Sequence, residues 1–437
     1  MPSTDDLFDS AMARHQAGEL DEAAALYHAI LEADARHAGA HNALGMLLHQ
    51  RGRSDEAVAC IRRALELDPQ ASGFLNNLGN VHIECKRPEE ALDCYLRAAT
   101  IDPESAMTLN NLGHAYVQLK RYAEGWQAFS DAVRIDPAYV QAYINLALVC
   151  VWREMLPAAA GFYRHALELD DGCIDAWREL GRTYYRMKRF DKAATVYRQW
   201  IERDPENPVP VHMLAACSQA DVPARAADAY VTHVFDRFAS TFDQLLVGRL
   251  GYQAPQLCAR MLARWVAAPT RQYELLDAGC GTGLCSPLLR PWARRLHGVD
   301  LSRGMLDKAH EKAAYDEYYC AELTAFLRAS PRQWDVVVSA DTLCYFGDLS
   351  ELFAALSESL KPGGVAVFTV EADDDAADGY ALKAHGRYAH ASRYVTTQLA
   401  GAGLELLDIA GETLRIEDGE PVAGWVVAAR CPVEEAA

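Results

Sequence analysis

Residues 274–283 read Glu-Leu-Leu-Asp-Ala-Gly-Cys-Gly-Thr-Gly. The apolar start predicts a short buried strand, and the three alternate glycines predict a tight turn into a helix from about Leu284. Glycines in such a turn let the backbone approach a ligand without a Cβ in the way. The spacing is Gly-x-Gly-x-Gly, not the Gly-x-Gly-x-x-Gly of dinucleotide sites, and Asp277 would repel a pyrophosphate. The turn therefore suits a ligand that carries cationic groups and no phosphate.

A second acid, Asp300, ends the next apolar run, residues 296–299, and follows Asp277 by 23 positions (300 − 277). An acid at the end of the neighbouring strand can accept both hydroxyls of a ribose. S-adenosylmethionine (SAM) combines a ribose with an ammonium and a sulfonium. We therefore predict a SAM site here, and the alternative is a glycine turn with two incidental acids.

Residues 274–371 resemble a class I SAM-dependent methyltransferase. Four segments carry the resemblance, in the family's order: Leu-Asp-Ala-Gly-Cys-Gly-Thr-Gly (276–283), Gly-Val-Asp-Leu-Ser-Arg-Gly-Met-Leu (298–306), Trp-Asp-Val-Val-Val-Ser-Ala-Asp (334–341) and Leu-Lys-Pro-Gly-Gly (360–364). The resemblance implies an α/β doubly wound, Rossmann-like domain with seven strands. It also implies SAM as the cofactor, S-adenosylhomocysteine as its product and no metal, and it says little about the methyl acceptor.

The expected cofactor residues lie in the glycine turn and at the ends of the following strands. They are Asp277, Gly279, Cys280, Gly281, Gly283, Asp300, Leu301, Met305, Glu322, Leu323 and Ser339. The resemblance implies that Leu301 and Met305 flank the adenine and that Glu322 faces its amine. Asp341 and Tyr345 follow the fourth strand, beside the expected methyl-transfer point, and are predicted catalytic residues.

Residues 386–395, Gly-Arg-Tyr-Ala-His-Ala-Ser-Arg-Tyr-Val, are expected to lie above the carboxyl ends of the strands, where ligands bind in this fold. His390 is a candidate base for an acceptor hydroxyl, amine or thiol, because imidazole titrates near neutral pH. Arg387, Tyr388 and Tyr394 are candidate substrate contacts. The alternative is a surface loop that leads into a helix, with a structural histidine.

The N-terminal half repeats every 34 residues. A Leu-Gly pair, once replaced by Leu-Ala, recurs at 44–45, 78–79, 112–113, 146–147 and 180–181. Small and aromatic residues recur at fixed distances from these pairs, which resembles the tetratricopeptide repeat (TPR), a helical hairpin. We count five repeats over 38–207 and a degenerate sixth before them, about six in all.

Asparagine precedes the Leu-Gly or Leu-Ala pair in three successive repeats, at Asn77, Asn111 and Asn145. Asparagine is a poor helix former, and its amide offers both a donor and an acceptor. This ladder resembles those by which some TPR arrays hold the backbone of an extended peptide, so we predict a protein or peptide partner in a groove. The alternative is that these side chains cap or space the inner helices.

Composition limits the class of protein. The chain has 437 residues, 51% hydrophobic and 24% charged, as expected of a soluble globular protein with two or three domains. A formal net charge of −19 argues against nucleic acid as a partner, because binding phosphates needs basic patches. No apolar stretch predicts a membrane span, residues 1–10 lack a signal-peptide profile, and the 12 scattered cysteines suit reduced thiols in the cytoplasm.

Three prolines, at 205, 208 and 210, suggest where the array ends. We predict a TPR array at 1–207, connecting helices at 208–245 and the methyltransferase domain at 246–437. Within the connecting part, residues 230–243 resemble the aromatic segment that closes over SAM in many members of the family.

We predict a SAM-dependent methyltransferase whose acceptor is a protein or peptide recruited by the groove. The first alternative is a small-molecule O- or N-methyltransferase whose array serves assembly, including association between copies of the chain. The second alternative is a non-catalytic scaffold that binds SAM.

Overall fold

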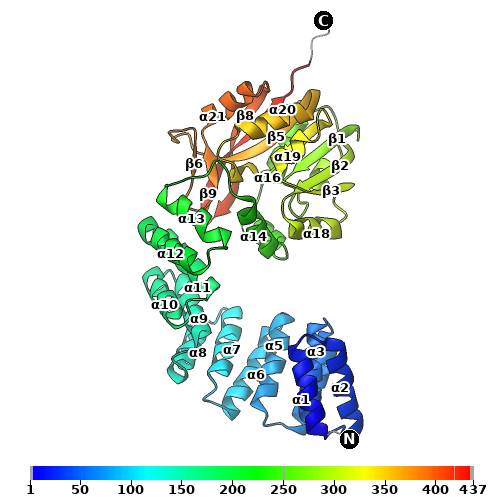
Figure 1. The fold of residues 1–437 in the computed structure, drawn as a ribbon, viewed down its shortest axis with the longest axis vertical. Coiled ribbons are helices and arrows are strands. Elements are labelled where there is room, and N and C mark those ends of the chain that lie inside the picture. The colour runs from blue at the N-terminus through cyan, green and yellow to red at the C-terminus, as the bar shows by residue number, and fades with distance from the viewer. Residues whose placement is uncertain (1–2, 250, 418, 434–437) are drawn as a thin grey trace. The chain divides into compact units, whose positions relative to one another are not determined.

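The computed structural model describes residues 3–249, 251–417 and 419–433 (Figure 1). The chain divides into two compact units, residues 1–187 and 188–437. The three-part division of the chain that the sequence predicts stays a prediction.

The first unit is built from helical hairpins that follow one another along the chain (Figure 1). Its helices are α1 (Thr4–Gln16), α2 (Leu20–Ala33), α3 (Ala38–Gln50), α4 (Ser54–Leu67), α5 (Ser72–Glu84), α6 (Pro88–Ile101), α7 (Ala106–Gln118), α8 (Tyr122–Ile135), α9 (Val140–Trp152), α10 (Leu156–Leu169) and α11 (Ile174–Arg186). The turns inside the hairpins each contain a residue with left-handed φ, and these recur every 34 residues: Gly18, Gly52, Lys86, Lys120 and Glu154. The backbone thus repeats with the period of the sequence.

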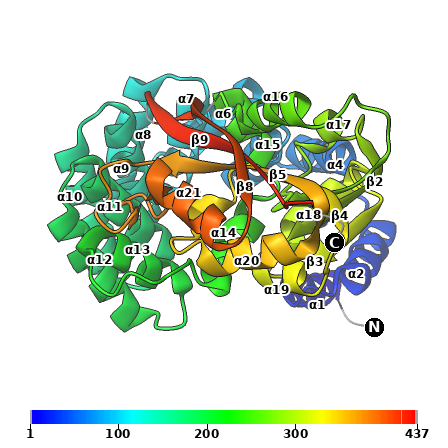
Figure 2. The ribbon, with the colours of Figure 1, turned by 90° about the horizontal axis from the view of Figure 1, so that it is seen from above.

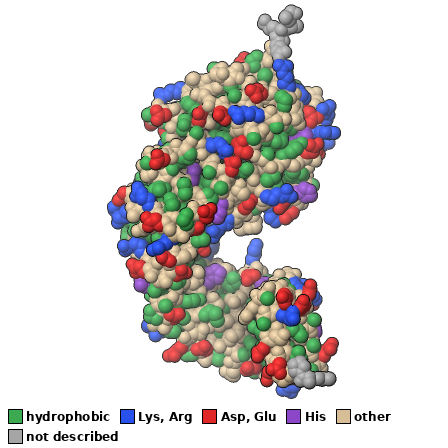
Figure 3. All heavy atoms as spheres, in the orientation of Figure 1, with side chains coloured by type: hydrophobic (Ala, Val, Ile, Leu, Met, Phe, Trp, Pro, Cys, Tyr) green, Lys and Arg blue, Asp and Glu red, His purple; other side chains and the backbone are tan. Residues whose placement is uncertain are grey.

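The small and aromatic positions of the repeat pack against each other. A Cβ on Gly79 would lie 2.5 Å from the ring of Tyr95, so only glycine lets α5 and α6 approach this closely. Tyr95 also packs with Leu112 and Ala115 of the next hairpin. The TPR interpretation is confirmed. On the face seen in Figure 3, acidic and basic side chains are interspersed with apolar ones. Exposed ion pairs such as Arg53–Glu56 also occur in the first unit.

The second unit begins with helices and continues as an α/β domain. The helices are α12 (Phe190–Arg203), α13 (Pro208–Ser218), α14 (Asp228–Phe238), α15 (Phe242–Arg249) and α16 (Ala254–Trp265). The strands are β1 (Tyr273–Ala278), β2 (Ala293–Asp300), β3 (Glu317–Cys320), β4 (Trp334–Ser339), β5 (Leu360–Ala372), β6 (Tyr380–Leu382), β7 (Tyr388–His390), β8 (Glu405–Glu417) and β9 (Glu420–Arg430). Between them lie α17 (Ser286–Leu289), α18 (Arg303–Glu311), α19 (Leu323–Arg328), the 3₁₀ turn η1 (Leu343–Tyr345), α20 (Ser350–Ser359) and α21 (Ser392–Gly401).

The sheet has the predicted doubly wound topology. Strands β3, β2, β1, β4 and β5 are parallel neighbours in that order, β9 runs antiparallel to β5, and β8 runs antiparallel to β9. Helix α16 packs on one face, while α19, α20 and α21 pack on the other (Figure 2). Central strands that are covered on both faces consist of continuous apolar runs, which is why they could be predicted from the sequence.

Three segments depart in part from what the local sequence suggests. The segment 386–395, for which a surface loop leading into a helix was the alternative, contains β7, which pairs with β6 and with the end of β5, and then the start of α21. Residues 411–420 belong mostly to β8 and β9, whose pairing continues to Glu417. The helix after the glycine turn is only the four residues of α17, which ends shortly before Pro291.

Candidate functional site

The glycine turn lies between β1 and α17, at the carboxyl end of the sheet. Gly279, Gly281 and Gly283 all have left-handed φ, between 52° and 88°, so the predicted turn is present. A Cβ on Gly279 would collide with Thr342, which follows β4. The nearest atom to a Cβ on Gly281 would be a ring carbon of Phe242 at 3.9 Å, so the backbone there leaves room on its outer side.

Asp277 lies under this turn with 1% of its surface exposed. The hydroxyl of Tyr315 donates to its Oδ2 at 2.6 Å, and its Oδ1 is buried without a hydrogen-bond partner among the described residues. Burial raises the pKa of this carboxyl to about 7. An unpartnered carboxylate oxygen in the interior is costly, so this atom fits a donor that arrives with a ligand.

Asp300 connects the turn to the end of β2. Its Oδ2 accepts from the Gly281 N–H and its Oδ1 from the Ser302 N–H, both at 2.8 Å. Burial raises the pKa of Asp300. Each carboxylate oxygen has two acceptor sites, so both can accept a further hydroxyl. The structure therefore brings Asp277, the glycine turn and Asp300 together, as predicted.

Other predicted cofactor residues surround this centre. Met305 is 1% exposed and follows Ser302, whose hydroxyl caps α18 by accepting from the Met305 N–H at 3.1 Å. Leu301 is partly exposed, and Cys280 is buried in the turn. Glu322 caps α19, with its carboxylate accepting the N–H groups of residues 324 and 325. Its carboxylate thus already has two donors.

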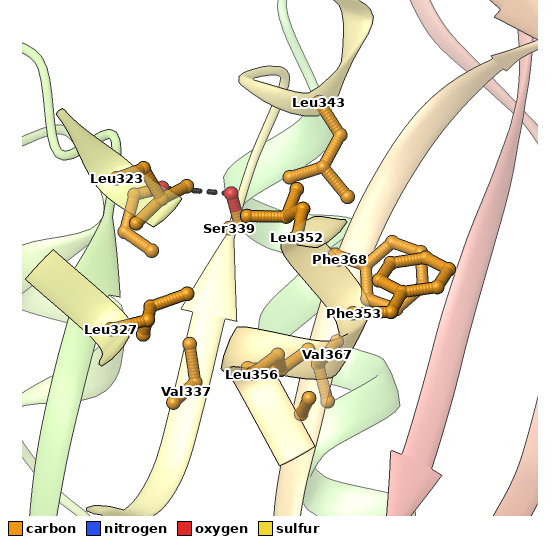
Figure 4. Close-up of a pocket in the computed structure, with 12 residues that line it drawn as sticks. Leu323, Leu327, Val337, Ser339, Leu343, Leu352, Phe353, Leu356, Val367 and Phe368 are labelled. Atoms are coloured by element: carbon orange, nitrogen blue, oxygen red, sulfur yellow. Dashed lines mark hydrogen bonds between the residues drawn. The ribbon is translucent and has the colours of Figure 1, made fainter. Parts of the chain in front are cut away.

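Ser339 and Leu323 line a small apolar cavity of about 20 Å³ on the α19–α20 side of the sheet (Figure 4). The Ser339 hydroxyl donates to the Ala278 carbonyl at 2.7 Å, the dashed line in Figure 4, and so joins β4 to β1. Leu352 and Phe353 of α20 close the cavity. Its apolar lining indicates a packing space of the core, and a dry one.

Helices α14 and α15, here called the strap (residues 228–249), are tied to the site by two acids. Asp236 accepts from the Ser302 hydroxyl at 2.5 Å and the Gly304 N–H at 3.0 Å. Asp243 accepts from Lys312 Nζ at 2.5 Å and from the Thr282 hydroxyl. The strap is thereby held both to the loop after β2 and to the glycine turn.

Aromatic rings continue from the strap toward β4. Phe235 makes edge contacts with Phe242, at 6.0 Å between ring centroids, and with Tyr345, at 5.4 Å. The resemblance indicated this aromatic segment, but the acids that anchor the strap were not identified from the sequence. Tyr345, a predicted catalytic residue, thus lies against the strap beside the end of β4.

Asp341 begins a group of five charged side chains, here called the carboxylate–arginine cluster: Asp341, Glu371, Arg387, Arg415 and Glu417. Arg415 Nη1 donates to both oxygens of Asp341 at 2.7 Å, and Arg387 Nε donates to Glu371 at 2.6 Å. Arg415 also pairs with Glu371 and with Glu417, and Arg387 with Glu417. Three carboxylates and two guanidiniums leave a formal charge of −1 (2 − 3) in a largely buried place.

Burial and the charges of the cluster shift the pKa values of its carboxyl groups. Burial raises the pKa of Asp341, although Arg415 opposes this. Burial also acts on Glu371, but Arg387 and Arg415 outweigh it and hold the pKa of Glu371 below its ordinary value. Asp341 also has a left-handed φ of 60°, and its N–H donates to the Thr369 hydroxyl at 2.8 Å. Strained backbone of this kind is frequent at functional sites.

Sequence reasoning missed part of this cluster. Arg415, Glu417 and the neighbouring His385 were not among the site residues predicted from the sequence. His385 Nε2 lies 3.4 Å from Glu371 Oε2, and burial lowers the pKa of this imidazole to about 4. No local signal marks Arg415, because its role depends on pairing with residues far away in the chain.

His390 does not lie where an acceptor could reach it. It is 0% exposed, its Nε2 donates to the Gly347 carbonyl at 3.0 Å, and its Nδ1 is also buried. Burial lowers its pKa to about 4. A general base must present a lone pair to the acceptor, so this position indicates a structural role in place of the predicted catalytic one.

The predicted substrate residues around His390 also stabilise the fold. Tyr388 is 0% exposed and donates to the Pro223 carbonyl at 2.6 Å. The Tyr394 hydroxyl donates to Asp348 at 3.2 Å and accepts from the Leu349 N–H at 3.1 Å. Only Arg387 among them belongs to the carboxylate–arginine cluster.

In the first unit, the three predicted asparagines form a ladder, but its bonds join one repeat to another. Each donates its side-chain amide to an asparagine of the preceding repeat: Asn77 to Asn42 at 3.1 Å, Asn111 to Asn80 at 3.4 Å and Asn145 to Asn110 at 2.8 Å. All three are partly exposed. Each side-chain amide has two N–H donors and uses one of them in the ladder, so a peptide could bind the second donor or the remaining acceptor sites.

The family described as "Methyltransferase domain" matches residues 250–408. Families described as "Tetratricopeptide repeat" match residues 8–72, 50–106, 108–139 and 153–217. A Malonyl-[acyl-carrier protein] O-methyltransferase of Enterobacter lignolyticus is 32% identical over 37% of this chain and 63% of that protein. The Biotin biosynthesis bifunctional protein BioHC of Saccharophagus degradans is 28% identical over 36% of this chain and 27% of that protein. The chain thus spans less than two thirds of the length of these curated relatives.

A solved structure described as "Functional Characterization of Pseudomonas Aeruginosa pilF" is 24% identical, with a TM-score of 0.42, over 46% of this chain and 92% of that one. Among the residues that the structure describes, no helix combines the length and apolar character needed to cross a membrane. Within the same ranges, no three His, Cys, Asp or Glu side chains are grouped so that they could hold a metal ion. The absence of a metal cofactor stays a prediction.

Proposed function

We propose that this chain, which carries tetratricopeptide repeats in its N-terminal half and a methyltransferase domain in its C-terminal half, transfers the methyl group of SAM to an acceptor borne by a protein or peptide that the repeats recruit. The observation that supports SAM most directly is the buried, unpartnered Oδ1 of Asp277 beneath a glycine turn. This carboxylate oxygen fits a ligand with an ammonium group, whereas the carboxylate would repel a phosphate.

SAM supplies an electrophilic methyl group on a sulfonium sulfur. In the proposal, Asp277 accepts a hydrogen bond from the ammonium. Asp300 accepts hydrogen bonds from the ribose hydroxyls, using the acceptor sites of its carboxylate that the Gly281 and Ser302 N–H groups do not occupy. The open backbone at Gly281 allows close approach. The strap, anchored by Asp236 and Asp243, then separates this site from water.

The acceptor is expected at the end of β4, beside Asp341 and Tyr345. Methyl transfer requires alignment of the acceptor, and a protonated acceptor must also lose its proton. Asp341 is proposed as the proton acceptor, because burial raises its pKa and so makes it a stronger base than an exposed carboxylate. Arg415 fixes its orientation through two hydrogen bonds of 2.7 Å.

Two observations support a protein-borne acceptor. The repeats form stacked hairpins of a kind that presents an extended binding surface. The name of the Enterobacter relative describes O-methyl transfer to a malonyl group on an acyl-carrier protein, that is, to an acceptor attached to a protein. It also supports oxygen as the atom that receives the methyl group.

A second candidate is O-methylation of a free small molecule, with the repeats serving assembly. The amide ladder favours it, because one amide donor of each of Asn77, Asn111 and Asn145 already bonds to the preceding repeat and so explains the asparagines without a peptide.

The test incubates the purified chain with SAM labelled on its methyl group and a cell extract, and then separates macromolecules from small molecules by ultrafiltration. Label that stays with macromolecules and is released by protease supports the first proposal. Label confined to the small-molecule fraction supports the second. Asp300→Ala is the control for enzyme-dependent label, and its label should fall at least about tenfold. A wild-type chain that neither binds S-adenosylhomocysteine nor transfers label overturns both.

A further inference from the structure

The buried hydrogen bond from Tyr315 to Asp277 has not been given a role in the proposed methyl transfer. Tyr315, in the loop between α18 and β3, lies beneath the glycine turn with 5% of its surface exposed. Its hydroxyl donates to Asp277 Oδ2 at 2.6 Å, across 38 positions of sequence. Asp277 thus has one oxygen held by a phenol and the other, Oδ1, left without a partner among the described residues.

The surrounding backbone is shaped to admit the Tyr315 ring. A Cβ on Gly298, in β2, would lie 2.8 Å from that ring. A Cβ on Gly283 would lie 3.5 Å from the ring and 2.8 Å from the Cβ of Ala314. Gly298 therefore makes room for the Tyr315 ring, and Gly283 makes room for the neighbouring Ala314.

The ring is also held from its other side. The N–H of Tyr315 donates to the Tyr318 hydroxyl at 3.0 Å, and the two rings meet edge to face at 5.5 Å. A phenol fixed by packing and by its backbone can hold its hydrogen-bond partner in one orientation. The Asp277 side chain can rotate about two torsions, and the Tyr315 hydroxyl is its hydrogen-bond donor. That donor therefore largely sets the orientation of the carboxylate.

We propose that Tyr315 is a positioning residue of the cofactor site, which holds Asp277 so that Oδ1 is the oxygen left to accept the ammonium of the bound cofactor. This inference rests on the proposed function, since it needs a cofactor with that group. Tyr315 acts through Asp277 and does not itself touch the reacting atoms.

The charges around Asp277 give the role a distinctive pH signature. Burial raises the pKa of Asp277 to about 7, the Tyr315 hydrogen bond lowers it, and the neighbouring Asp300 raises it. The thiols of Cys258 in α16, and of Cys280 and Cys285 around the turn, also lie near, but burial raises their pKa values, so they stay neutral here. Cofactor binding should therefore strengthen as pH rises through about 7, when Asp277 ionises. Without the Tyr315 hydroxyl the transition should move to higher pH.

The experiment measures the affinity for S-adenosylhomocysteine by calorimetry from pH 6 to pH 9, using the full chain. Tyr315→Phe removes only the hydroxyl. It should weaken binding at least about fivefold at pH 7 and move the midpoint of the pH dependence upward by at least ~0.5 unit. Tyr95→Phe is the matched control in the first unit, since the Tyr95 hydroxyl is also buried and donates to Asn80 at 2.6 Å. Its affinity should equal that of the wild type at every pH.

Asp277→Asn provides a second arm that does not depend on how well Tyr315→Phe folds. Its affinity should be weak and nearly independent of pH between 6 and 8, because no carboxylate titrates at this position. Adding Tyr315→Phe to Asp277→Asn should then cause no further shift with pH. An Asp277→Asn variant that still shows the wild-type pH dependence overturns the inference.

The outcomes separate the inference from the proposed function. A wild type that binds no S-adenosylhomocysteine contradicts the function. A wild type that binds, with a Tyr315→Phe variant of unchanged affinity and midpoint, overturns the role of Tyr315 alone. Equal weakening at all pH values, with a lowered melting temperature, also overturns it, because this is the signature of a merely structural tyrosine.

Discussion

Arg415 Nη1 lies 2.7 Å from both carboxylate oxygens of Asp341, although the two residues are 74 positions apart. Arg415 comes from β8, which is separated from β4 in the sheet by β5 and β9. The guanidinium thus crosses the end of the sheet to reach Asp341, the second residue after β4, and only 2% of the Arg415 side chain is exposed. Removing it would leave three carboxylates with one arginine.

The first prediction follows from that burial. Arg415→Ala should lower the free energy of unfolding by about 3–5 kcal/mol, because it leaves uncompensated charge in the interior. Denaturant unfolding measures this. Arg97→Ala is the matched control, since Arg97 is 54% exposed and lies 3.8 Å from Asp93, and it should change stability by less than about 0.5 kcal/mol. Equal effects of the two variants would show that the cluster is not a stabilising centre.

The second prediction tests Asp341 as the proton acceptor. Asp341→Asn keeps the size of the side chain but removes its basicity, so turnover should fall roughly a hundredfold or more. Affinity for S-adenosylhomocysteine should stay within about twofold, because Asp277 and Asp300 hold that ligand. Single-turnover kinetics on the acceptor found by labelling measures the first quantity and calorimetry the second. Normal turnover in this variant would remove Asp341 from the machinery.

The third prediction concerns Asp300. Its carboxylate accepts from Gly281 and Ser302 and is expected to accept from a ribose as well. Asp300→Ala should lower the affinity for S-adenosylhomocysteine at least about tenfold, since hydrogen bonds to a charged group contribute about 1.5–3 kcal/mol each. The far-ultraviolet circular dichroism should match that of the wild type. Unchanged affinity in a folded variant would contradict the assignment.

The fourth prediction concerns His390 and acid. Burial lowers its pKa to about 4, so the unfolded chain takes up a proton near pH 6.5 while the folded histidine stays neutral. Its contribution to the free energy of unfolding is therefore constant above about pH 6.5 and is lost as pH falls from there toward 4, by at most about 1.4 kcal/mol per unit.

His390→Gln should be less stable than the wild type at pH 7.5, because it loses packing and strains the bond to Gly347. The difference between the two proteins should narrow as the pH is lowered to 5, measured by urea unfolding at each pH. A difference that is the same at both pH values would mean that His390 titrates normally in the folded chain.

The fifth prediction tests whether the asparagine ladder recruits the acceptor. The triple variant Asn77→Ala, Asn111→Ala and Asn145→Ala removes the donors that link α5, α7 and α9 to their preceding repeats. Alanine is the better helix former, so the helices should persist. If the ladder also holds a peptide, kcat/KM for a protein-borne acceptor should fall, by roughly tenfold or more, with affinity for S-adenosylhomocysteine unchanged. Wild-type kcat/KM for this acceptor at low concentration would show that the ladder does not recruit it.

Patterns of short range allowed the repeats and the cofactor turn to be predicted. The 34-residue period, the Gly79–Tyr95 contact and the glycine turn after β1 follow from helix periodicity, glycine conformation and apolar strand runs, which act over a few residues. Asp277 and Asp300 could be placed together for a related reason. Each ends a strand, and neighbouring parallel strands bring their carboxyl ends to one edge.

The tertiary structure alone decided the surroundings of Asp341, where we propose that the acceptor binds. Arg415 joined Asp341 because β8 continues past the glycine at 411, where the local sequence resembles a loop and pairing with β9 outweighs that tendency. His390 lies in the interior because β7 pairs with β5 and β6, and no local sequence pattern indicated this pairing. Likewise Tyr315 reached Asp277 from a loop 38 positions away. Such contacts form because burial, strand pairing and charge pairing stabilise the assembled fold, and these energies depend on which distant residues are brought together.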